Sequence, residues 1–285
     1  MGKSLISSIT HNKSARSFGA LFFVLVTIAL PIQAIASSQE TADLKVEVGI
    51  STMRFKYEEF TDTGRVWDKE QGSLPGMSLR LGQRIAEWEW EGSASSFYGQ
   101  VLYTGETNYH QPFDTRTDET IIDLSLRLGH WFGEQYPFMP YAGVGYRRWD
   151  RDIYGGSIGT TQVSGLFESY RWQYAWVGSK FITFQDNVSQ FLLDVGLLKP
   201  LRPELHMNSG STILHLGSNT GLRTMLSWDV KLKGDDRNDH LVIEPWYEYW
   251  NMGRSPIVFT SSGPIYEPDS KTHNYGVNLR LAWTL

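Results

Sequence analysis

The chain contains no cysteine. This absence excludes a disulfide framework, a thiolate metal site, a cysteine nucleophile and a lipidated N-terminal cysteine. Cations are also scarce relative to acids, with 26 Lys and Arg against 31 Asp and Glu and a net charge of −5. A net acidic chain lacks the clustered cations that nucleic-acid binding requires, so we expect no nucleic-acid partner.

Long hydrophobic runs are absent after the N-terminal segment, residues 1–36. This segment combines three cations, an apolar run from Phe18 to Ile32 and the small-residue site Ala34-Ile35-Ala36. The pattern is typical of a cleaved secretory signal, which predicts a mature protein, residues 37–285, beginning at Ser37. Because the segment has no acid, its removal changes the net charge from −5 to −8.

The alternative for this segment is an uncleaved membrane anchor. The apolar run is short for a spanning helix, and Pro31 interrupts it. We therefore favour cleavage.

Aromatic residues are abundant, at 14% of the chain, and apolar residues recur with period two. Six segments alternate regularly and predict strands: 122–128, 170–176, 191–197, 222–232, 241–249 and 275–285. Four less regular segments complete the set: 44–58, 75–90, 95–109 and 138–149. The apparent phase slip between Ile50 and Met53 suggests a bulge. The total is ten strands, with eight as the alternative.

The expected connections alternate between long and short. The long ones are 59–74, 110–117, 150–167, 199–219 and 251–269, and the short ones are 91–94, 133–137, 184–188 and 234–239. Outer-membrane barrels have long extracellular loops and short periplasmic turns. The pattern therefore predicts an antiparallel up-and-down β-barrel in the outer membrane, with both termini in the periplasm.

A soluble β-sandwich or lipocalin-like barrel would also alternate, with its apolar face inside. The apolar rows here are bulky and rich in rings, which favours a lipid-facing wall with aromatic girdles. We expect four apolar side chains to face lipid: Leu124, Leu193, Trp228 and Leu281. We expect four charged side chains to face the lumen: Asp123, Asp194, Arg223 and Arg280.

Two strand segments and the signal site carry a family resemblance. The segment Pro140-Tyr141-Ala142-Gly143-Val144-Gly145-Tyr146 looks like a transmembrane strand of proteins similar to outer membrane protein A. The closing strand, residues 275–285, resembles the C-terminal signal read by the barrel-assembly machinery, although such signals usually end in Phe or Trp and this one ends in Leu285. Together with Ala34-Ile35-Ala36, they make the chain resemble the superfamily of small outer-membrane β-barrel proteins, which implies a membrane and a topology but little chemistry.

The regular strands place five acids and five cations on the lumen face. They are Asp123, Asp194, Asp229, Glu244 and Glu248, with Arg127, Arg171, Arg223, Lys231 and Arg280. Buried charges must be paired or solvated. In a barrel of about ten strands, which is narrow, this balance favours a lumen plugged by salt bridges over a polar path for a small solute.

The segment Trp149-Asp150-Arg151-Asp152 is a candidate for a protease-like site, because two acids spaced by one residue could activate a water. Omptin proteases are ten-stranded barrels with an aspartate pair and an Asp–His pair near the outer rim. Here the only adjacent Asp–His is Asp239-His240, beside Asp235 and Asp236 in a predicted periplasmic turn. The chain is therefore omptin-sized without the omptin catalytic pattern.

Among the remaining candidate residues, we expect none to be catalytic, to bind a cofactor or to bind a metal. The histidines expected on the loop side are His110, His206, His215 and His273, and none lies in a Ser–His frame. Glu204, His206 and His215 lack tight metal-ligand spacing, and His130 is expected at an interface.

Two apolar segments are candidates for surface roles. The run Pro245-Trp246-Tyr247-Glu248-Tyr249-Trp250 reads as an aromatic girdle with Trp246 and Trp250 inside, rather than as a sugar-binding platform. Residues 257–266 are expected to form an apolar hairpin with Ser261-Ser262-Gly263 as its turn, either standing above the membrane or folding over the barrel mouth.

The sequence thus predicts an outer-membrane barrel with a structural or surface-interaction role. The alternatives are a narrow channel for a small solute and a membrane-embedded hydrolase acting on protein or lipid. Expected partners are outer-membrane lipid and lipopolysaccharide, the barrel-assembly machinery and an extracellular ligand at the loops. No cofactor is expected.

Overall fold

The computed structural model describes residues 43–107, 110–207, 212–232, 239–260 and 263–285. The expected signal segment and the acidic turn residues Asp235 and Asp236 lie outside these ranges. All regular structure in the described ranges is β-strand. None of it is a helix long and apolar enough to cross a membrane.

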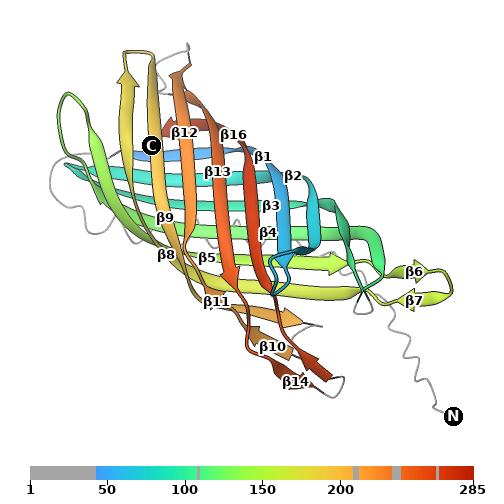
Figure 1. Ribbon diagram of the computed structural model, residues 1–285. Coiled ribbons are helices and arrows are strands. Elements are labelled where there is room, and N and C mark those ends of the chain that lie inside the picture. The colour runs from blue at the N-terminus through green and yellow to red at the C-terminus, as the bar shows by residue number, and fades with distance from the viewer. Residues whose placement is uncertain (1–42, 108–109, 208–211, 233–238, 261–262) are drawn as a thin grey trace. The chain divides into compact units, whose positions relative to one another are not determined.

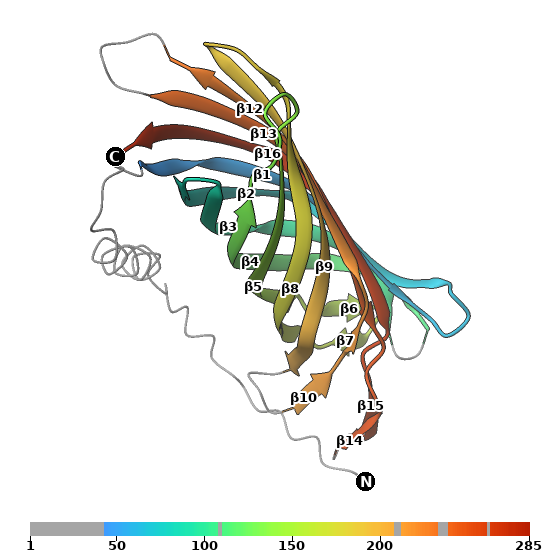
Figure 2. The same cartoon turned by 90° about the vertical axis from the view of Figure 1, so that its left-hand side faces the viewer.

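Ten long strands form a closed antiparallel barrel (Figures 1 and 2). They are β1 (Leu44–Phe60), β2 (Val66–Ile85), β3 (Trp88–Glu106), β4 (Pro112–His130), β5 (Phe138–Ile153), β8 (Leu166–Gln185), β9 (Ser189–Met207), β12 (Gly221–Lys231), β13 (His240–Gly253) and β16 (Asp269–Thr284). Each pairs with its neighbour along the chain, and β1 pairs with β16 to close the ring. The predicted fold and strand number are confirmed.

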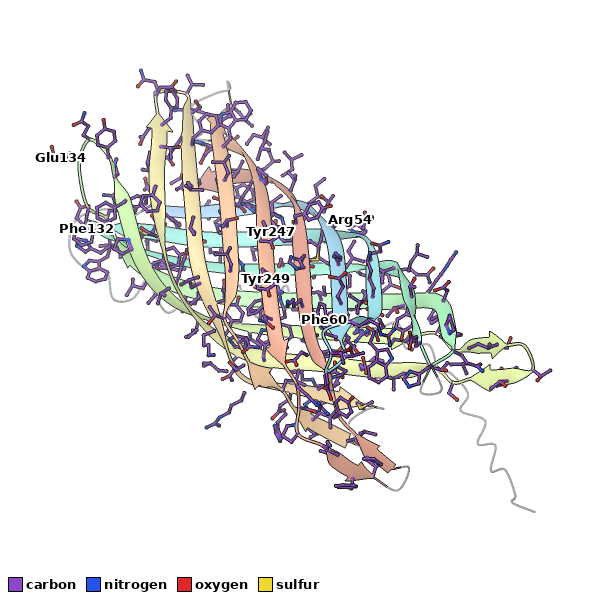
Figure 3. All side chains as sticks on the ribbon, viewed as in Figure 1. Arg54, Phe60, Phe132, Glu134, Tyr247 and Tyr249 are labelled. Atoms are coloured by element: carbon purple, nitrogen blue, oxygen red, sulfur yellow. The ribbon has the colours of Figure 1, made fainter. Side chains whose placement is uncertain are left out.

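The two ends of the barrel differ. At the end that we call the terminus end, Leu44 and Leu285 exchange backbone hydrogen bonds, and short turns join the strands. The opposite, loop end carries short additional strands (Figure 1): β6 (Gly156–Ile158), β7 (Thr161–Val163), β10 (Thr212–His215), β11 (Gly217–Ser218), β14 (Val258–Thr260) and β15 (Gly263–Ile265). Figure 3 places Phe132 and Glu134 at the terminus end and Phe60 toward the loop end.

Several strands extend further than the sequence predicted. The expected connection 59–74 is mostly wall, because β1 ends at Phe60 and β2 begins at Val66. The expected turn at 91–94 is also wrong, since the chain turns at Ala86 and Glu87. The small polar run around residues 92–96 resembles turn chemistry but lies in a strand, because lumen-facing positions need not be apolar. Strand β9 likewise continues to Met207 through the expected loop 199–219.

The bulge expected between Ile50 and Met53 is absent. Strand β1 pairs with β2 without a register shift until Glu59 and Phe60. Ile50 is exposed on the outside, while Met53 is buried inside. The strand is unbroken, and the apparent phase slip has another cause. The side chains that β1 points into the lumen change from charged to apolar along the strand.

This change divides the barrel into two halves. The terminus half contains residues 44–51 of β1 and the parts of the other strands at the same level. The loop half contains residues 53–60 of β1 and the parts of the other strands at that level. The outer wall of the terminus half exposes apolar side chains, such as Leu281 at 55% and Leu126 at 52%. The inside of the loop half holds most of the hydrophobic core, including Phe55 and Trp250.

The predicted facing is confirmed in the terminus half. Leu193, Trp228 and Leu281 are exposed, whereas Asp194 and Arg280 are buried. In the loop half it is wrong for β8. Four aromatic side chains predicted to face out are buried inside: Tyr170, Trp172, Tyr174 and Trp176. Arg171, predicted to face the lumen, is on the other face of β8 and donates to Ser169.

Candidate functional site: the charged lumen

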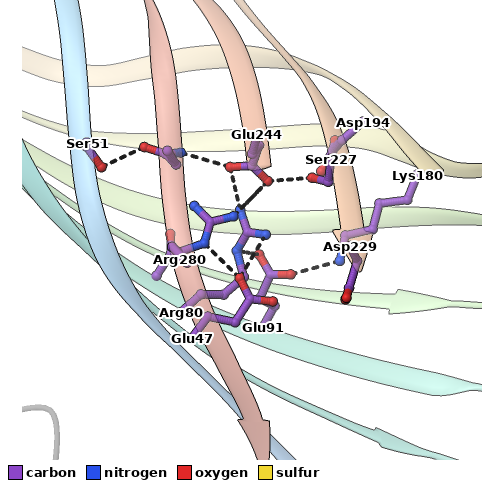
Figure 4. A network of polar contacts seen from close by, with 12 residues as sticks. Glu47, Ser51, Arg80, Glu91, Lys180, Asp194, Ser227, Asp229, Glu244 and Arg280 are labelled. Atoms are coloured by element: carbon purple, nitrogen blue, oxygen red, sulfur yellow. Dashed lines mark hydrogen bonds and ion pairs between the residues drawn. The ribbon is translucent and has the colours of Figure 1, made fainter. Parts of the chain in front are cut away.

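The lumen of the terminus half is crossed by a network of ion pairs, which we call the terminal charge layer (Figure 4). It contains five cations and six acids: Lys45, Arg80, Arg127, Lys180 and Arg280, with Glu47, Glu89, Glu91, Asp194, Asp229 and Glu244. These residues come from β1, β2, β3, β4, β8, β9, β12, β13 and β16. The layer therefore ties together most of the wall.

Glu244 is the centre of this layer. It contacts Arg80 at 2.9 Å and Arg280 at 3.0 Å, and it accepts from Ser227 at 2.6 Å and Asn278 at 2.9 Å. Its carboxylate is 1% exposed. Removing one partner from such a buried pair typically costs about 3–5 kcal/mol, because the other charge is left uncompensated.

Arg127 connects the opposite side of the layer. It contacts Glu91 at 2.7 Å, pairs with Asp194 and lies 4.7 Å above the ring of Tyr141. Lys180 contacts Glu91 at 2.8 Å. Chains of acid and base thus run across the lumen from β2 to β8 without a gap in charge pairing.

A second charge layer lies nearer the loop end and is balanced. Asp123 contacts Arg147 at 2.9 Å and Arg223 at 3.3 Å, and both guanidinium groups also pair with Glu248. Arg147 lies 5.0 Å from the centroid of the Trp250 ring. Aromatic rings on one side and carboxylates on the other hold these arginines in place.

A third group, at the loop end, is strongly unbalanced. Arg151 contacts Glu168 at 2.8 Å, Glu70 at 3.1 Å and Glu59 at 3.4 Å. We call the surrounding carboxyls the acidic cluster, and all are at least 91% buried: Glu59, Asp68, Glu70, Glu119, Glu168 and Glu267. Six carboxyls therefore surround one guanidinium.

Tyrosines share their protons with this cluster. Tyr57 donates to Glu59 at 2.8 Å, and Tyr170 donates to Glu267 at 2.5 Å. Glu267 lies between β15 and β16, outside the strands. Burial, together with the neighbouring carboxylates of Glu59 and Glu168, raises the pKa of Glu267 well above its usual range.

Two cavities interrupt the packing of the lumen. A vestibule of about 290 Å³ at the terminus end is lined by members of the terminal charge layer, including Lys45, Arg80 and Glu244. A smaller chamber of about 80 Å³ lies between the terminal charge layer and the second layer. Arg80 and Glu244 line both cavities, so their ion pair forms the partition.

The protease-like candidate is not assembled. Asp150 and Asp152 lie on the outer face of β5, where Asp150 pairs with Arg148 and accepts from Ser169 at 2.6 Å. Arg151, between them, points inward. His240 pairs instead with Asp229 at 2.5 Å, in the terminal charge layer. The aspartate pair therefore lies in the loop half of the barrel, whereas the Asp–His pair lies in the terminus half.

The histidine candidates fall into separate surroundings. Glu204 does approach two of them, at 3.1 Å from His206 and 3.6 Å from His215. Among the described residues, however, no group of His, Asp and Glu has the arrangement of a metal site. His273 bonds to Tyr247 at 2.9 Å, and the ring of His130 meets that of Trp88. His110 is exposed beside Glu106.

The two surface candidates take the predicted forms. In β13, Trp250 is buried inside, and Tyr247 and Tyr249 lie on the outer wall (Figure 3). Val258 pairs with Ile265 in the expected hairpin, whose turn residues 261–262 lie outside the described ranges. Val258 and Ile265 pack against the core, while Phe259 is 82% exposed. The hairpin thus covers part of the barrel mouth with one face and exposes the other.

Sequence reasoning missed most of the acidic cluster. Its members lie in segments expected to be loops, such as residues 59–74, or next to aromatic residues expected to face lipid. A period-two pattern was present in each of two segments: Tyr57 with Glu59, and Asp68 with Glu70. It was missed because residues 59–74 were expected to form a long connection between strands.

No protein-family model and no curated protein matches this sequence. Solved structures do match. The crystal structure of the outer membrane protease OmpT from Escherichia coli has a TM-score of 0.62 at 9% identity, covering 88% of this chain and 99% of that chain. At that identity the similarity concerns the fold alone.

Two further matches are more distant. The translocator domain of the autotransporter NalP from Neisseria meningitidis has a TM-score of 0.43 at 11% identity, over 92% of this chain and 95% of that one. The outer membrane protein OprG from Pseudomonas aeruginosa has a TM-score of 0.40 at 13% identity, over 87% and 98%. The chain has the fold of the small outer-membrane β-barrel proteins.

Proposed function

We propose that this chain is an outer-membrane protein whose lumen is closed and whose loop end is presented to the outside of the cell. The observation that carries this proposal is the terminal charge layer, in which buried acids and bases pair across the whole lumen. The exposed apolar wall of the terminus half supports insertion in lipid.

The orientation follows from the connections. The short turns, the start of β1 and the end of β16 all lie at the terminus end, which we assign to the periplasm. The outer wall then contacts outer-membrane lipid and lipopolysaccharide, and β16 carries the signal for the assembly machinery. The exposed half of the β14–β15 hairpin, with Phe259, is the proposed contact for an external partner.

A narrow channel is the second candidate. The vestibule and the chamber lie in series, and the paired side chains of Arg80 and Glu244 line both. The second charge layer still closes the chamber on the loop side, where Asp123, Arg147 and Glu248 form its lining. We therefore rank the closed lumen first.

Single-barrel conductance in planar bilayers tests this ranking. The wild-type barrel is expected to pass almost no current, because each solute path meets paired charges. The double variant Arg80→Ala/Glu244→Ala removes both side chains of the partition, and Arg54→Ala, on the outer wall, is the control (Figure 3). Large and stable openings in the wild type would reject the closed lumen in favour of the channel.

A further inference from the structure

The β14–β15 hairpin is joined to the barrel at its base and is otherwise separate from the wall sheet (Figure 2). Among the described residues, its two strands pair only with each other. The base is closed by Ser255 and Glu267. The Ser255 amide donates to the Glu267 carbonyl at 3.0 Å, and the Glu267 amide donates to the Ser255 hydroxyl at 2.9 Å. The hairpin can therefore move about this base as one unit.

The contacts that hold the hairpin over the barrel mouth are modest. On its inner face, the half-buried side chains of Val258 and Ile265 pack against the core. On its outer side, Arg254 pairs with Asp62 at 2.5 Å and lies 4.0 Å above the ring of Tyr266. The Asp62 side chain is 69% exposed, and an ion pair in water contributes little to stability.

The side chain of Glu267 connects the hairpin to the acidic cluster. Its Oε1 atom accepts from the Tyr170 hydroxyl at 2.5 Å and from the Tyr57 hydroxyl at 3.2 Å. The titratable and charged groups that face it come from three wall strands: Tyr57 and Glu59 of β1, Arg151 of β5, and Glu168 and Tyr170 of β8. The backbone of Glu267 thus belongs to the hairpin base, while its carboxyl belongs to the cluster.

The acidic cluster cannot be fully ionised while it is buried. In the part of the chain that the structure describes, its six carboxyls share one paired cation, Arg151. Buried charges without a counter-charge are strongly unfavourable, so the closed form must keep protons on some of these carboxyls. When pH rises and Glu267 loses its proton, a new negative charge appears beside Glu59 and Glu168.

The members of the cluster differ in how easily they can reach water. Five of them lie within the wall strands β1, β2, β4 and β8, whose backbones are paired with their neighbours. Glu267 lies between β15 and β16, outside the strands. Moving a wall carboxyl into water would break backbone hydrogen bonds of the barrel. Glu267 can leave with the hairpin at the loss of the Val258 and Ile265 contacts.

We propose that the β14–β15 hairpin is a proton-operated lid, which is closed over the barrel mouth in acid and swings away at more alkaline pH. In the closed form, the protonated Glu267 carboxyl remains in contact with Tyr57 and Tyr170. In the open form, its carboxylate is in water, and the inner face of the hairpin, with Val258 and Ile265, is exposed. The lid acts above the two charge layers, so its movement leaves the closure of the lumen by those layers unchanged.

The test measures the position of the lid by double electron–electron resonance between two nitroxide labels. The chain has no cysteine, so labels attach only where a cysteine is introduced. The lid pair is Phe259→Cys/Thr160→Cys, at exposed positions of β14 and of the turn between β6 and β7. In the barrel refolded in detergent, we expect a second distance that grows from a minor component at pH 5 to the main one at pH 8.5. In the Glu267→Gln background, the pH 5 distance should persist at both pH values.

Two controls separate lid movement from other effects. The pair Thr63→Cys/Thr160→Cys omits the lid, and its distance should not change with pH. The variant Asp62→Asn makes the same carboxyl-to-amide change at the outer contact of the hairpin, and the pH-dependent second distance should persist in it. Should Glu267→Gln fail to refold, Glu59→Gln is the second test, because it removes a neighbouring charge and should move the opening to higher pH.

Three results would overturn the proposal. The first is a single distance for the lid pair at every pH in the wild type. The second is a pH response that persists in Glu267→Gln or is abolished equally by Asp62→Asn. The third is the same change in both label pairs, which would mean that the whole loop end loosens. The measurement is made in detergent, so its outcome is independent of the conductance result that tests the closed lumen.

Discussion

The terminus half and the loop half of this barrel have opposite patterns. In the terminus half, apolar side chains such as Leu281 face out and charges such as Arg280 face in. In the loop half, Phe55 and Tyr170 fill the inside, while Arg54 and Lys56 occupy the outer face of β1. The first pattern suits lipid and the second suits water. One set of continuous strands therefore carries both patterns, and in β1 the change falls within a few residues.

The two halves also treat buried charge differently. The terminal charge layer has nearly equal numbers of acids and bases, so each carboxylate meets a cation. In the described part of the chain, the acidic cluster of the loop half has six carboxyls and one paired cation, Arg151. Balanced pairing makes the terminus half insensitive to small changes of pH, whereas the loop half depends on one guanidinium and on shared protons.

The largest expected effect is therefore at Arg151. Replacement by Met keeps the apolar stem and removes the one cation that pairs with Glu59, Glu70 and Glu168 among the residues that the structure describes. We expect a loss of about 3–5 kcal/mol in the free energy of unfolding, measured by urea titration of the barrel in detergent. Arg148→Met, on the outer face of the same strand, should cost at most about 1 kcal/mol. Similar losses in both variants would show that the acidic cluster does not need its cation.

The next effect probes the outer wall. An arginine in place of Leu281 puts a charge on the apolar wall of the terminus half and should destabilise the barrel in liposomes by about 2–4 kcal/mol. Gln100→Arg, on the outer face of β3 in the loop half, should have almost no effect, because its neighbours there are the polar side chains of Arg116 and Asp118. Equal tolerance at both positions would place the membrane elsewhere on the wall.

The sequence was informative where one environment extends along a strand. In β16 the alternation of Val277, Leu279 and Leu281 with Asn278 and Arg280 predicted the facing correctly, since lipid lies on one side throughout. It failed in β8, because apolar residues were assumed to face lipid at every level. Tyr170 and Trp172 stand above the apolar band, where apolar side chains belong inside. The chamber could not be predicted at all, since it depends on which donors find partners across the lumen.

The smallest expected effect, and the one that separates the halves by pH, concerns Glu267. Because its pKa is raised in the folded protein, Glu267 keeps its proton at pH values where the unfolded chain has lost it. Its contribution to stability is complete below the unfolded pKa of about 4.3 and is lost as pH rises through the folded value. The urea midpoint of the wild type should therefore fall as pH rises from 5 to 8.

Glu267→Gln should flatten this fall, since the amide is neutral at every pH and its oxygen still accepts from Tyr170. Asp186, in a turn of the terminus end, is the control. The backbone amides of Val188 and Ser189 lower its pKa, so its contribution is present above the unfolded value near 3.9 and is lost only in more acidic solution. Asp186→Asn should therefore leave the slope between pH 5 and 8 unchanged. A wild-type midpoint that stays constant over this range, or a slope that survives Glu267→Gln unaltered, would mean that the carboxyl is ionised in the folded barrel and that a cation other than Arg151 compensates it.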